Sequence, residues 1–188
     1  MAKKAKIALA GEGGQGVQSV ANILVEAAYE EGMEALYIPN FGVEQRGGVS
    51  VAYVQISEEA IGSPKFKFAD IIIALSGRAV RRSKKYVNED TLFIYDTAIE
   101  NVENDLPTNA KKVTGIPATD VAKEEFSPRV FNVIIMGAVI GMTGVVTVEQ
   151  AKAAISKKLG YKFEQDPKLK ELNFKALERG VDLVKDQV

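Results

Sequence analysis

Gly11-Glu12-Gly13-Gly14-Gln15-Gly16 places four glycines within six residues, between two segments of different periodicity. The residues before it, 7–10, are all apolar, as expected for a buried strand of a parallel sheet. After it, apolar residues recur at helical spacing from Val17 to Ala28, which predicts an amphipathic helix. A strand, a glycine turn and a helix in this order direct the helix N-terminus, with its unpaired N–H groups and positive dipole end, towards a ligand or a partner.

The glycine turn matches the pattern G-x-G-x-x-G, which by itself is a weak signal and admits three interpretations. A dinucleotide site needs an acidic residue at the end of the second strand to hold the ribose hydroxyls. That strand ends in Tyr37-Ile38-Pro39-Asn40, without a carboxylate, and Glu12 places negative charge where a pyrophosphate would arrive. The glycines could instead only permit a tight turn and close packing. The third interpretation is a turn that meets a phosphate-bearing ligand or a neighbouring chain.

Strand and helix patterns alternate along the rest of the chain. Short apolar or period-two segments predict strands at 35–38, 49–56, 71–75, 91–95 and 112–116, and helical spacing predicts helices at 78–86, after Pro117, and at 131–142, 148–159 and 167–184. This alternation predicts an α/β fold with a mostly parallel, doubly wound, Rossmann-like sheet and helices on both faces. Because no linker or repeat interrupts the pattern, we expect residues 1–188 to form a single domain.

A second loop rich in special residues follows the second strand: Asn40-Phe41-Gly42-Val43-Glu44-Gln45-Arg46-Gly47-Gly48. Gly47 and Gly48 would let the backbone approach a partner while the Arg46 guanidinium binds a carboxylate or phosphate through two hydrogen bonds. The alternative is an internal Glu44–Arg46 ion pair that only fixes the loop, since exposed pairs of this kind are common. The two loops follow successive strands, so we expect them to be neighbours at the carboxyl edge of the sheet, where ligands bind.

The composition excludes several classes of chemistry. Lys and Arg number 24 against 25 Asp and Glu, and a net charge of -1 gives no basic field for nucleic acid. The chain has no Cys and no His, so it cannot ligate an iron–sulfur cluster through thiolate and lacks the commonest general base and metal ligand. Asp70 and Asp96, at strand ends, are weak catalytic candidates without a His. These observations favour a binding or assembly function and predict no metal site.

Two further segments each have two interpretations. Residues 130–148 carry no charge and are long enough to suggest a membrane span, but polar residues and glycines interrupt them. We therefore expect a buried helix that runs into a turn, no membrane span and a cytoplasmic protein. Five cations gather on the helix predicted at 78–86: Arg78, Arg81, Arg82, Lys84 and Lys85. They could form an electrostatic docking patch or only a solvated helix face.

Taken together, the two loops resemble the gamma subunit of 2-oxoacid:ferredoxin oxidoreductases. The matching patterns are Gly11-x-Gly13-Gly14-Gln15-Gly16-Val17 and Pro39-x-x-Gly42-x-Glu44-x-Arg46-Gly47-Gly48-x-Ser50, followed by Ile61-x-Ser63-Pro64, Ala69-Asp70, Asn132 with Gly137-Ala138, and Asn173-x-x-Ala176-Leu177-x-x-Gly180. Each pattern is weak alone, but their order and spacing are specific, and the resemblance covers essentially the whole chain.

The resemblance implies a subunit, not catalytic alone, of a complex that oxidatively decarboxylates a 2-oxoacid to an acyl-CoA and passes electrons to ferredoxin. It implies alpha and beta partners, with a delta subunit as a further candidate, that hold thiamine diphosphate, magnesium and iron–sulfur clusters. Coenzyme A would be shared, and the sequence after Gly42 slightly favours 2-oxoglutarate. The positions that match are expected to contact coenzyme A or another subunit: Gly13, Gly14, Gln15, Gly16, Arg46, Gly47 and Gly48. A stand-alone Rossmann-type nucleotide-binding oxidoreductase or regulator is the alternative.

Overall fold

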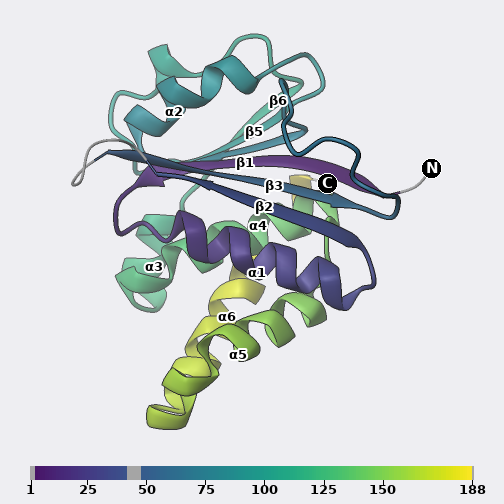
Figure 1. The fold of residues 1–188 in the computed structure, drawn as a ribbon. Coiled ribbons are helices and arrows are strands. Elements are labelled where there is room, and N and C mark those ends of the chain that lie inside the picture. Colours follow the sequence, from purple (N-terminus) through teal and green to yellow (C-terminus); the bar gives the residue numbers. More distant parts are fainter. Residues whose placement is uncertain (1–2, 42–47, 188) are drawn as a thin grey trace.

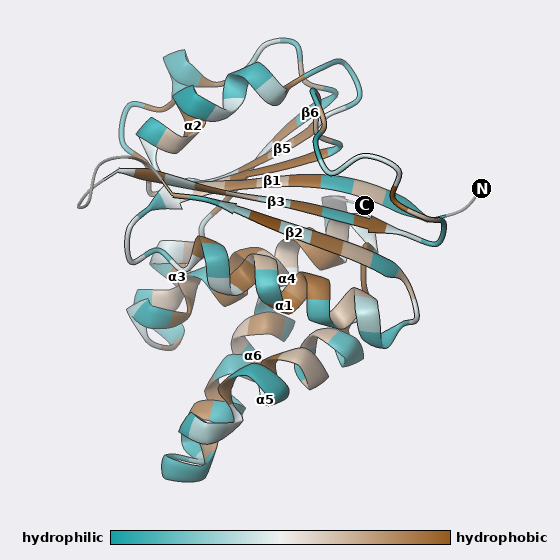
Figure 2. Cartoon of the chain, viewed as in Figure 1, coloured by the Kyte–Doolittle hydropathy of each residue, from teal (hydrophilic) through white to brown (hydrophobic). Residues whose placement is uncertain are grey.

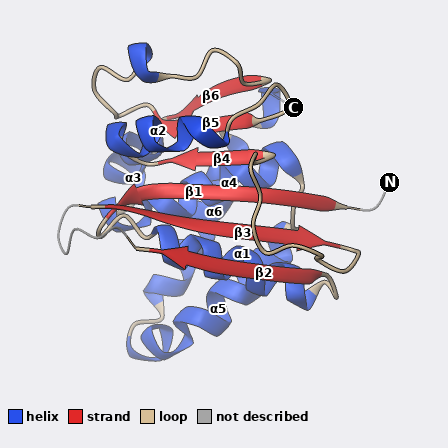
Figure 3. Ribbon diagram, turned by 45° about the horizontal axis from the view of Figure 1, so that its top comes forward, coloured by secondary structure: helices blue, strands red, loops and turns tan. Residues whose placement is uncertain are grey.

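The computed structural model describes residues 3–41 and 48–187, which form a six-stranded sheet with helices on both faces (Figure 1). The sheet order is β2-β3-β1-β4-β5-β6, as seen in Figure 3. The strands are β1 (Lys4–Glu12), β2 (Glu34–Asn40), β3 (Val49–Ser57), β4 (Ile71–Ala74), β5 (Leu92–Asp96) and β6 (Lys112–Ile116). The α/β class predicted from the alternating pattern is confirmed.

The sheet is mostly parallel, and β3 is the strand that reverses. β1, β4, β5 and β6 pair in parallel, whereas β3 pairs antiparallel with both β1 and β2. The connection of residues 41–48 is too short for a parallel crossover, which needs about a dozen residues or more, so β3 returns beside β2 as a hairpin. β2 also runs two residues past the predicted end, through Pro39, because an edge strand tolerates a missing N–H.

Helices cover the two faces of the sheet unequally. They are α1 (Val17–Glu30), α2 (Gly77–Ser83), α3 (Ala118–Glu125), α4 (Phe131–Thr143), α5 (Val148–Gln165) and α6 (Lys168–Asp182), with short 3-10 turns η1 (Lys84–Tyr86), η2 (Glu103–Asp105), η3 (Pro128–Val130) and η4 (Lys185–Gln187). α2 lies on one face, and the other five α-helices lie on the opposite face (Figure 1). α5 extends beyond the predicted end at Leu159, because Phe163 still packs into the core.

The sheet separates two apolar cores, and alternate side chains of β3 pack into one or the other of them. Ala52, Val54 and Ile56 pack on the side of α1 and α4, while Val49 and Val51 pack on the side of α2. Both faces of the strand are therefore buried, and Figure 2 shows apolar strands between the helical layers. The predicted alternation is confirmed.

α4 packs against α6 so closely that their backbones touch. A Cβ atom on Gly137 would lie 2.0 Å from the Leu177 carbonyl oxygen, and one on Gly180 would lie 2.0 Å from the Ile134 carbonyl oxygen. Two of the patterns that carried the family resemblance thus meet at this crossing. α4 is the buried helix expected within residues 130–148, and in the described part of the chain no helix is both long and apolar enough to cross a membrane.

Candidate functional site

The carboxyl edge of β1 and β4 is where the chain changes direction across the sheet. β1 leads into α1 on one face and β4 leads into α2 on the other (Figure 1). In open α/β sheets, ligands bind at such a switch point. The glycine turn after β1 therefore occupies the position in the fold where a ligand or partner is expected.

Gln15 holds the glycine turn against the neighbouring strand. The Glu12 backbone N–H donates to Gln15 Oε1 at 2.7 Å, and Gln15 Nε2 donates to the Leu75 carbonyl oxygen, just after β4, at 2.8 Å. Both ends of the amide are thus engaged within the chain. Among the predicted site residues, Gln15 is a positioning residue for the turn.

Of the four glycines in the turn, Gly11 and Gly16 are packed against neighbouring side chains, whereas Gly13 and Gly14 are open. Gly16 has φ 77°, and a Cβ atom there would lie 2.0 Å from Asn132 Nδ2 at the start of α4. Gly13 and Gly14 are exposed, and a Cβ atom on either would meet nothing within 4 Å. Close packing accounts for Gly16, whereas Gly13 and Gly14 offer bare backbone to whatever approaches the edge.

A pocket of about 410 Å³ opens beside this bare backbone. Its lining comes from the glycine turn, the first turn of α1 and both sides of the second loop: Glu12, Gly13, Gly14, Gly16, Val17, Gln18, Ser19, Phe41 and Ser50. Phe41 is 68% exposed at its rim. Because Phe41 belongs to the second loop and Ser50 follows it by two residues, the expectation that the two loops are neighbours is confirmed for the described residues.

The second loop itself lies largely outside the described residues. Arg46 and Gly47, and with them the choice between an anion contact and a Glu44–Arg46 pair, fall in the range 42–47 that the structure leaves undescribed. Gly48 is described and half-buried just before β3.

A hydrogen-bond chain joins the elements under the pocket. Gln18 Nε2 donates to Ser50 Oγ at 2.5 Å, and the Tyr37 hydroxyl donates to Gln18 Oε1 at 2.5 Å. Burial raises the pKa of Tyr37, so its hydroxyl stays protonated and remains a donor. Sequence reasoning missed Gln18 and Tyr37, although Ser50 belongs to one of the patterns that signalled the family. These linked hydrogen bonds hold α1, β2 and β3 in place relative to one another at the carboxyl edge.

The two carboxylates considered as catalytic candidates support the fold. Asp70 Oδ2 accepts the Lys6 N–H at 2.7 Å. Asp96 is 2% exposed and accepts hydrogen bonds from the Ala98 N–H at 3.1 Å and from the hydroxyl and the N–H of Thr119. Within the described ranges, no group of three His, Cys, Asp or Glu residues could hold a metal ion.

The cationic helix is partly neutralised. Arg81 Nη1 lies 2.7 Å from Asp105 Oδ2, and Lys84 Nζ lies 4.0 Å from the other oxygen of the same carboxylate. Arg82 and Lys85 are exposed. The pairing favours a solvated helix face over a dedicated docking patch for this part of the cluster.

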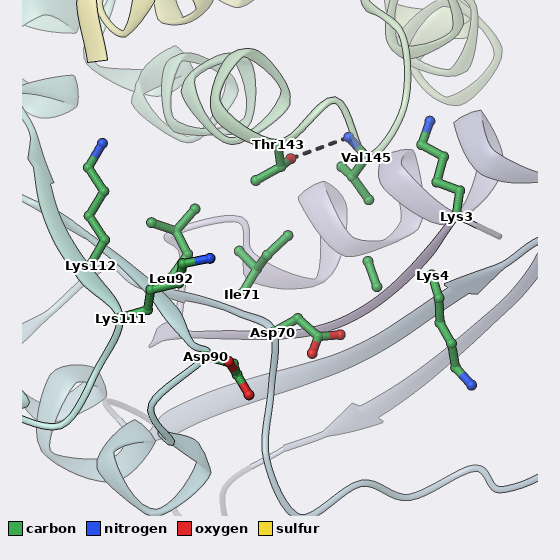
Figure 4. A pocket seen from close by; sticks show the side chains of 11 residues that line it. Lys3, Lys4, Asp70, Ile71, Asp90, Leu92, Lys111, Lys112, Thr143 and Val145 are labelled. Carbon is green, nitrogen blue, oxygen red and sulfur yellow. Dashed lines mark hydrogen bonds between the residues drawn. The ribbon is translucent and has the colours of Figure 1, made fainter. Parts of the chain in front are cut away.

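Another hollow, of about 310 Å³, lies at the opposite edge of the sheet, near the start of β1 (Figure 4). Charges of both signs line it, including those of Lys3, Lys4, Asp70 and Asp90. Thr143 Oγ1 accepts the Val145 N–H at 3.3 Å on its far side. Parallel strands begin here, and ligand sites of such sheets lie at the other edge, so the carboxyl-edge pocket is the better candidate.

Comparison with known proteins assigns the chain to a family. The family model described as "Pyruvate ferredoxin/flavodoxin oxidoreductase" matches residues 6–183. The chain belongs to this family. The resemblance inferred from the two loops is thereby confirmed.

Members of the pyruvate ferredoxin/flavodoxin oxidoreductase family resemble the chain over nearly its whole length. Ketoisovalerate oxidoreductase subunit VorA of Methanothermobacter marburgensis is 33% identical over 182 residues, which are 96% of this chain and 36% of VorA. The gamma subunit of a keto/oxoacid ferredoxin oxidoreductase from Geobacter sulfurreducens superimposes with a TM-score of 0.79 at 28% identity, covering 96% of this chain and 95% of that one.

A third member, 2-oxoglutarate:ferredoxin oxidoreductase from Magnetococcus marinus with 2-oxoglutarate, coenzyme A and succinyl-CoA bound, superimposes with a TM-score of 0.87 at 26% identity. The match covers 99% of this chain and 32% of that one. This chain therefore spans about a third of the length of VorA and of the Magnetococcus chain, and nearly all of the separate Geobacter gamma subunit.

Proposed function

We propose that the chain is the gamma subunit of a cytoplasmic 2-oxoacid:ferredoxin oxidoreductase, in which it contributes to coenzyme A binding and to subunit assembly. The complex would convert a 2-oxoacid, coenzyme A and oxidised ferredoxin to an acyl-CoA, CO₂ and reduced ferredoxin. The observation that carries the proposal is the bare Gly13–Gly14 backbone beside the 410 Å³ carboxyl-edge pocket, in a chain whose family match covers residues 6–183.

The carboxyl edge suits a phosphate-bearing ligand that a second subunit also contacts. N–H groups at the start of α1 are unpaired by the helix, and its dipole favours an anion there. Gly13 and Gly14 let such a group approach the backbone closely. Glu12 also lines the pocket, so an anion would bind on the glycine side, away from that carboxylate. The exposed ring of Phe41 offers an apolar contact at the rim.

The redox chemistry would belong to the partner subunits. With no Cys and no His, this chain offers no thiolate or imidazole to an iron–sulfur cluster. We therefore assign thiamine diphosphate, magnesium and the clusters to alpha, beta or delta subunits, and ferredoxin would contact this chain only indirectly. Of the known substrates of the relatives, we favour 2-oxoglutarate, since the Magnetococcus enzyme that binds it superimposes over 99% of this chain.

Reconstitution with alpha and beta subunits from the same organism tests the proposal. The chain should co-purify with both subunits, and the complex should reduce ferredoxin with 2-oxoglutarate only when coenzyme A is present. Failure to bind thiamine-dependent partners would refute the assembly function. Micromolar binding of NAD or FAD by the chain alone would favour a stand-alone nucleotide-binding oxidoreductase instead.

A pair of matched variants tests whether the glycine turn contacts coenzyme A or another subunit. Gly13→Val adds a side chain where the structure has open space, and Gly62→Val does the same in an exposed loop away from the carboxyl edge. Both variants should fold, because neither glycine has a positive φ. Only Gly13→Val should raise the KM for coenzyme A or weaken assembly, by about tenfold for a blocked close approach. Equal behaviour of the two variants would remove the glycine turn from the site.

A further inference from the structure

Ser50 brings a hydroxyl group to the wall of the carboxyl-edge pocket. It lines this pocket together with Gln18 and Ser19. Its Oγ accepts a hydrogen bond from Gln18 Nε2 at 2.5 Å. A hydroxyl group has one hydrogen to donate and two lone pairs that accept. Because Gln18 occupies only a lone pair, the hydrogen of Ser50 stays available for a group in the pocket.

The direction of the hydrogen bonds behind Ser50 is set at a backbone carbonyl group. Asn22 Nδ2 donates to the Gln18 carbonyl oxygen at 2.8 Å, and since a carbonyl oxygen only accepts, this contact fixes which end of the Asn22 amide is the donor. Burial raises the pKa of Tyr37, and a hydrogen bond from the Asn22 side chain opposes this shift, as a donor to the phenol oxygen does. The Tyr37 oxygen therefore accepts from Asn22 and keeps its own hydrogen for another partner.

That partner is the amide of Gln18. The Tyr37 hydroxyl donates to Gln18 Oε1 at 2.5 Å, which leaves the Nε2 end of the amide to donate to Ser50. The four side chains thus form a relay with one direction, from Asn22 through Tyr37 and Gln18 to Ser50. Among residues 3–41 and 48–187, no group accepts the Ser50 hydrogen at the end of this relay.

We infer that Ser50 donates this hydrogen to a phosphate oxygen of a ligand in the carboxyl-edge pocket, and that Asn22, Tyr37 and Gln18 are positioning residues for it. The inference rests on the proposed function, which expects a phosphate-bearing ligand beside the exposed glycine backbone of the same pocket. An ionised phosphate oxygen only accepts hydrogen bonds. The fixed direction of the relay therefore favours phosphate over ligand groups that donate.

Two serine hydroxyl groups in the same pocket provide a matched control. Ser19 also lines the pocket, but it is exposed and takes no part in the relay. In the reconstituted complex, Ser50→Ala should raise the KM for coenzyme A about tenfold with kcat unchanged, because a hydrogen bond to a charged group is lost. Ser19→Ala should change this KM less than about twofold. Equal effects of the two substitutions would overturn the inference.

Gln18→Glu tests the direction of the relay. A carboxylate only accepts, so it would take the hydrogens of both Tyr37 and Ser50 and turn the Ser50 hydrogen away from the pocket. The variant should raise the KM for coenzyme A about tenfold or more at neutral pH. Adding Ser50→Ala to it should then cause no further rise, whereas independent losses would multiply. A further tenfold rise in the double variant would contradict the relay.

Gly13→Val separates this inference from the proposed function. If Gly13→Val raises the KM for coenzyme A while Ser50→Ala behaves like Ser19→Ala, the ligand binds in the pocket without the Ser50 hydrogen bond, and only the inference fails. If Gly13→Val leaves both the KM and assembly unchanged, the proposed function fails, and the inference that rests on it fails too.

Discussion

At the scale of single residues, the glycine turn owes its shape to contacts that a local motif does not specify. Gln15 spans from the Glu12 N–H to the Leu75 carbonyl oxygen, 60 positions away along the chain. Gly16 takes a left-handed conformation and lies against Asn132. The pattern G-x-G-x-x-G therefore encodes a turn packed against the residue after β4 and against α4, and its two central glycines are the exposed ones.

Gly16→Ala and Gly14→Ala should separate packing from backbone strain. Both glycines have positive φ, 77° and 91°, so either change should cost about 1–2 kcal/mol of strain. Only Gly16→Ala also brings a Cβ atom against Asn132, so urea unfolding should show it to be less stable by a further ~1–3 kcal/mol. The double variant Gly16→Ala/Asn132→Ala should recover this second part. Equal stability of the two single variants would show that the turn moves freely away from α4.

At the scale of elements, the α4–α6 crossing and the α1–α5 contact hold the thick helical layer together in different ways. The crossing depends on direct backbone contact at Gly137 and Gly180. The α1–α5 contact carries an exposed ion pair at its surface, in which Lys157 Nζ contacts Glu26 and lies 3.0 Å from Glu30 Oε1. Packing should therefore dominate the stability of this layer, and the ion pair should add a small, pH-dependent part.

Gly137→Ala and Gly160→Ala should change stability in opposite directions. The added methyl group at Gly137 has no space, because the Leu177 carbonyl oxygen would be 2.0 Å away, so a loss of about 1–3 kcal/mol is expected. Gly160 lies within α5 with nothing near its missing Cβ atom, so alanine there should gain about 0.5–1 kcal/mol of helix propensity. Thermal unfolding measures both. A stable Gly137→Ala protein would mean that α6 can shift along α4.

Acid should remove the contribution of the α1–α5 ion pair. The hydrogen bond and charge of Lys157 lower the pKa of Glu30, and the Glu26 and Glu30 carboxylates raise the pKa of Lys157. A carboxyl group whose pKa is lower in the folded state stabilises it above the unfolded pKa, and the effect is lost as pH falls through the folded pKa. The stability difference between the wild type and Lys157→Ala should therefore be present near pH 7 and be lost in acid, as the pH falls through the lowered pKa of Glu30. A difference that persists in acid would assign it to the packing of the lysine stem.

At the scale of the whole molecule, periodicity along the sequence predicted the helices, the strands and both covered faces of the sheet. It did not indicate that β3 runs antiparallel, because the alternation of Val51, Ala52 and Tyr53 is the same in either direction. Periodicity also could not predict the Asp96–Thr119 and Gln15–Leu75 hydrogen bonds, because they join residues that are distant in the sequence and that only the fold brings together. Gly13, Gly14 and Gly16 were predicted as site residues, and the structure shows which of them face outward. Contacts of these residues with coenzyme A or another subunit remain a prediction.

The two edges of the sheet should respond differently when the complex assembles. The carboxyl edge exposes the Gly13 and Gly14 backbone and the Phe41 ring, whereas the opposite edge presents the mixed charges of Lys3, Lys4 and Asp90. Burial of backbone N–H groups slows their hydrogen exchange. In the reconstituted complex, peptides covering residues 11–19 should therefore exchange more slowly than in the free chain, while peptides covering 88–92 and 110–113 should be unchanged. If only the peptides covering 88–92 and 110–113 were protected, the partner would bind at the edge where the parallel strands begin. The glycine turn would then have no function in assembly.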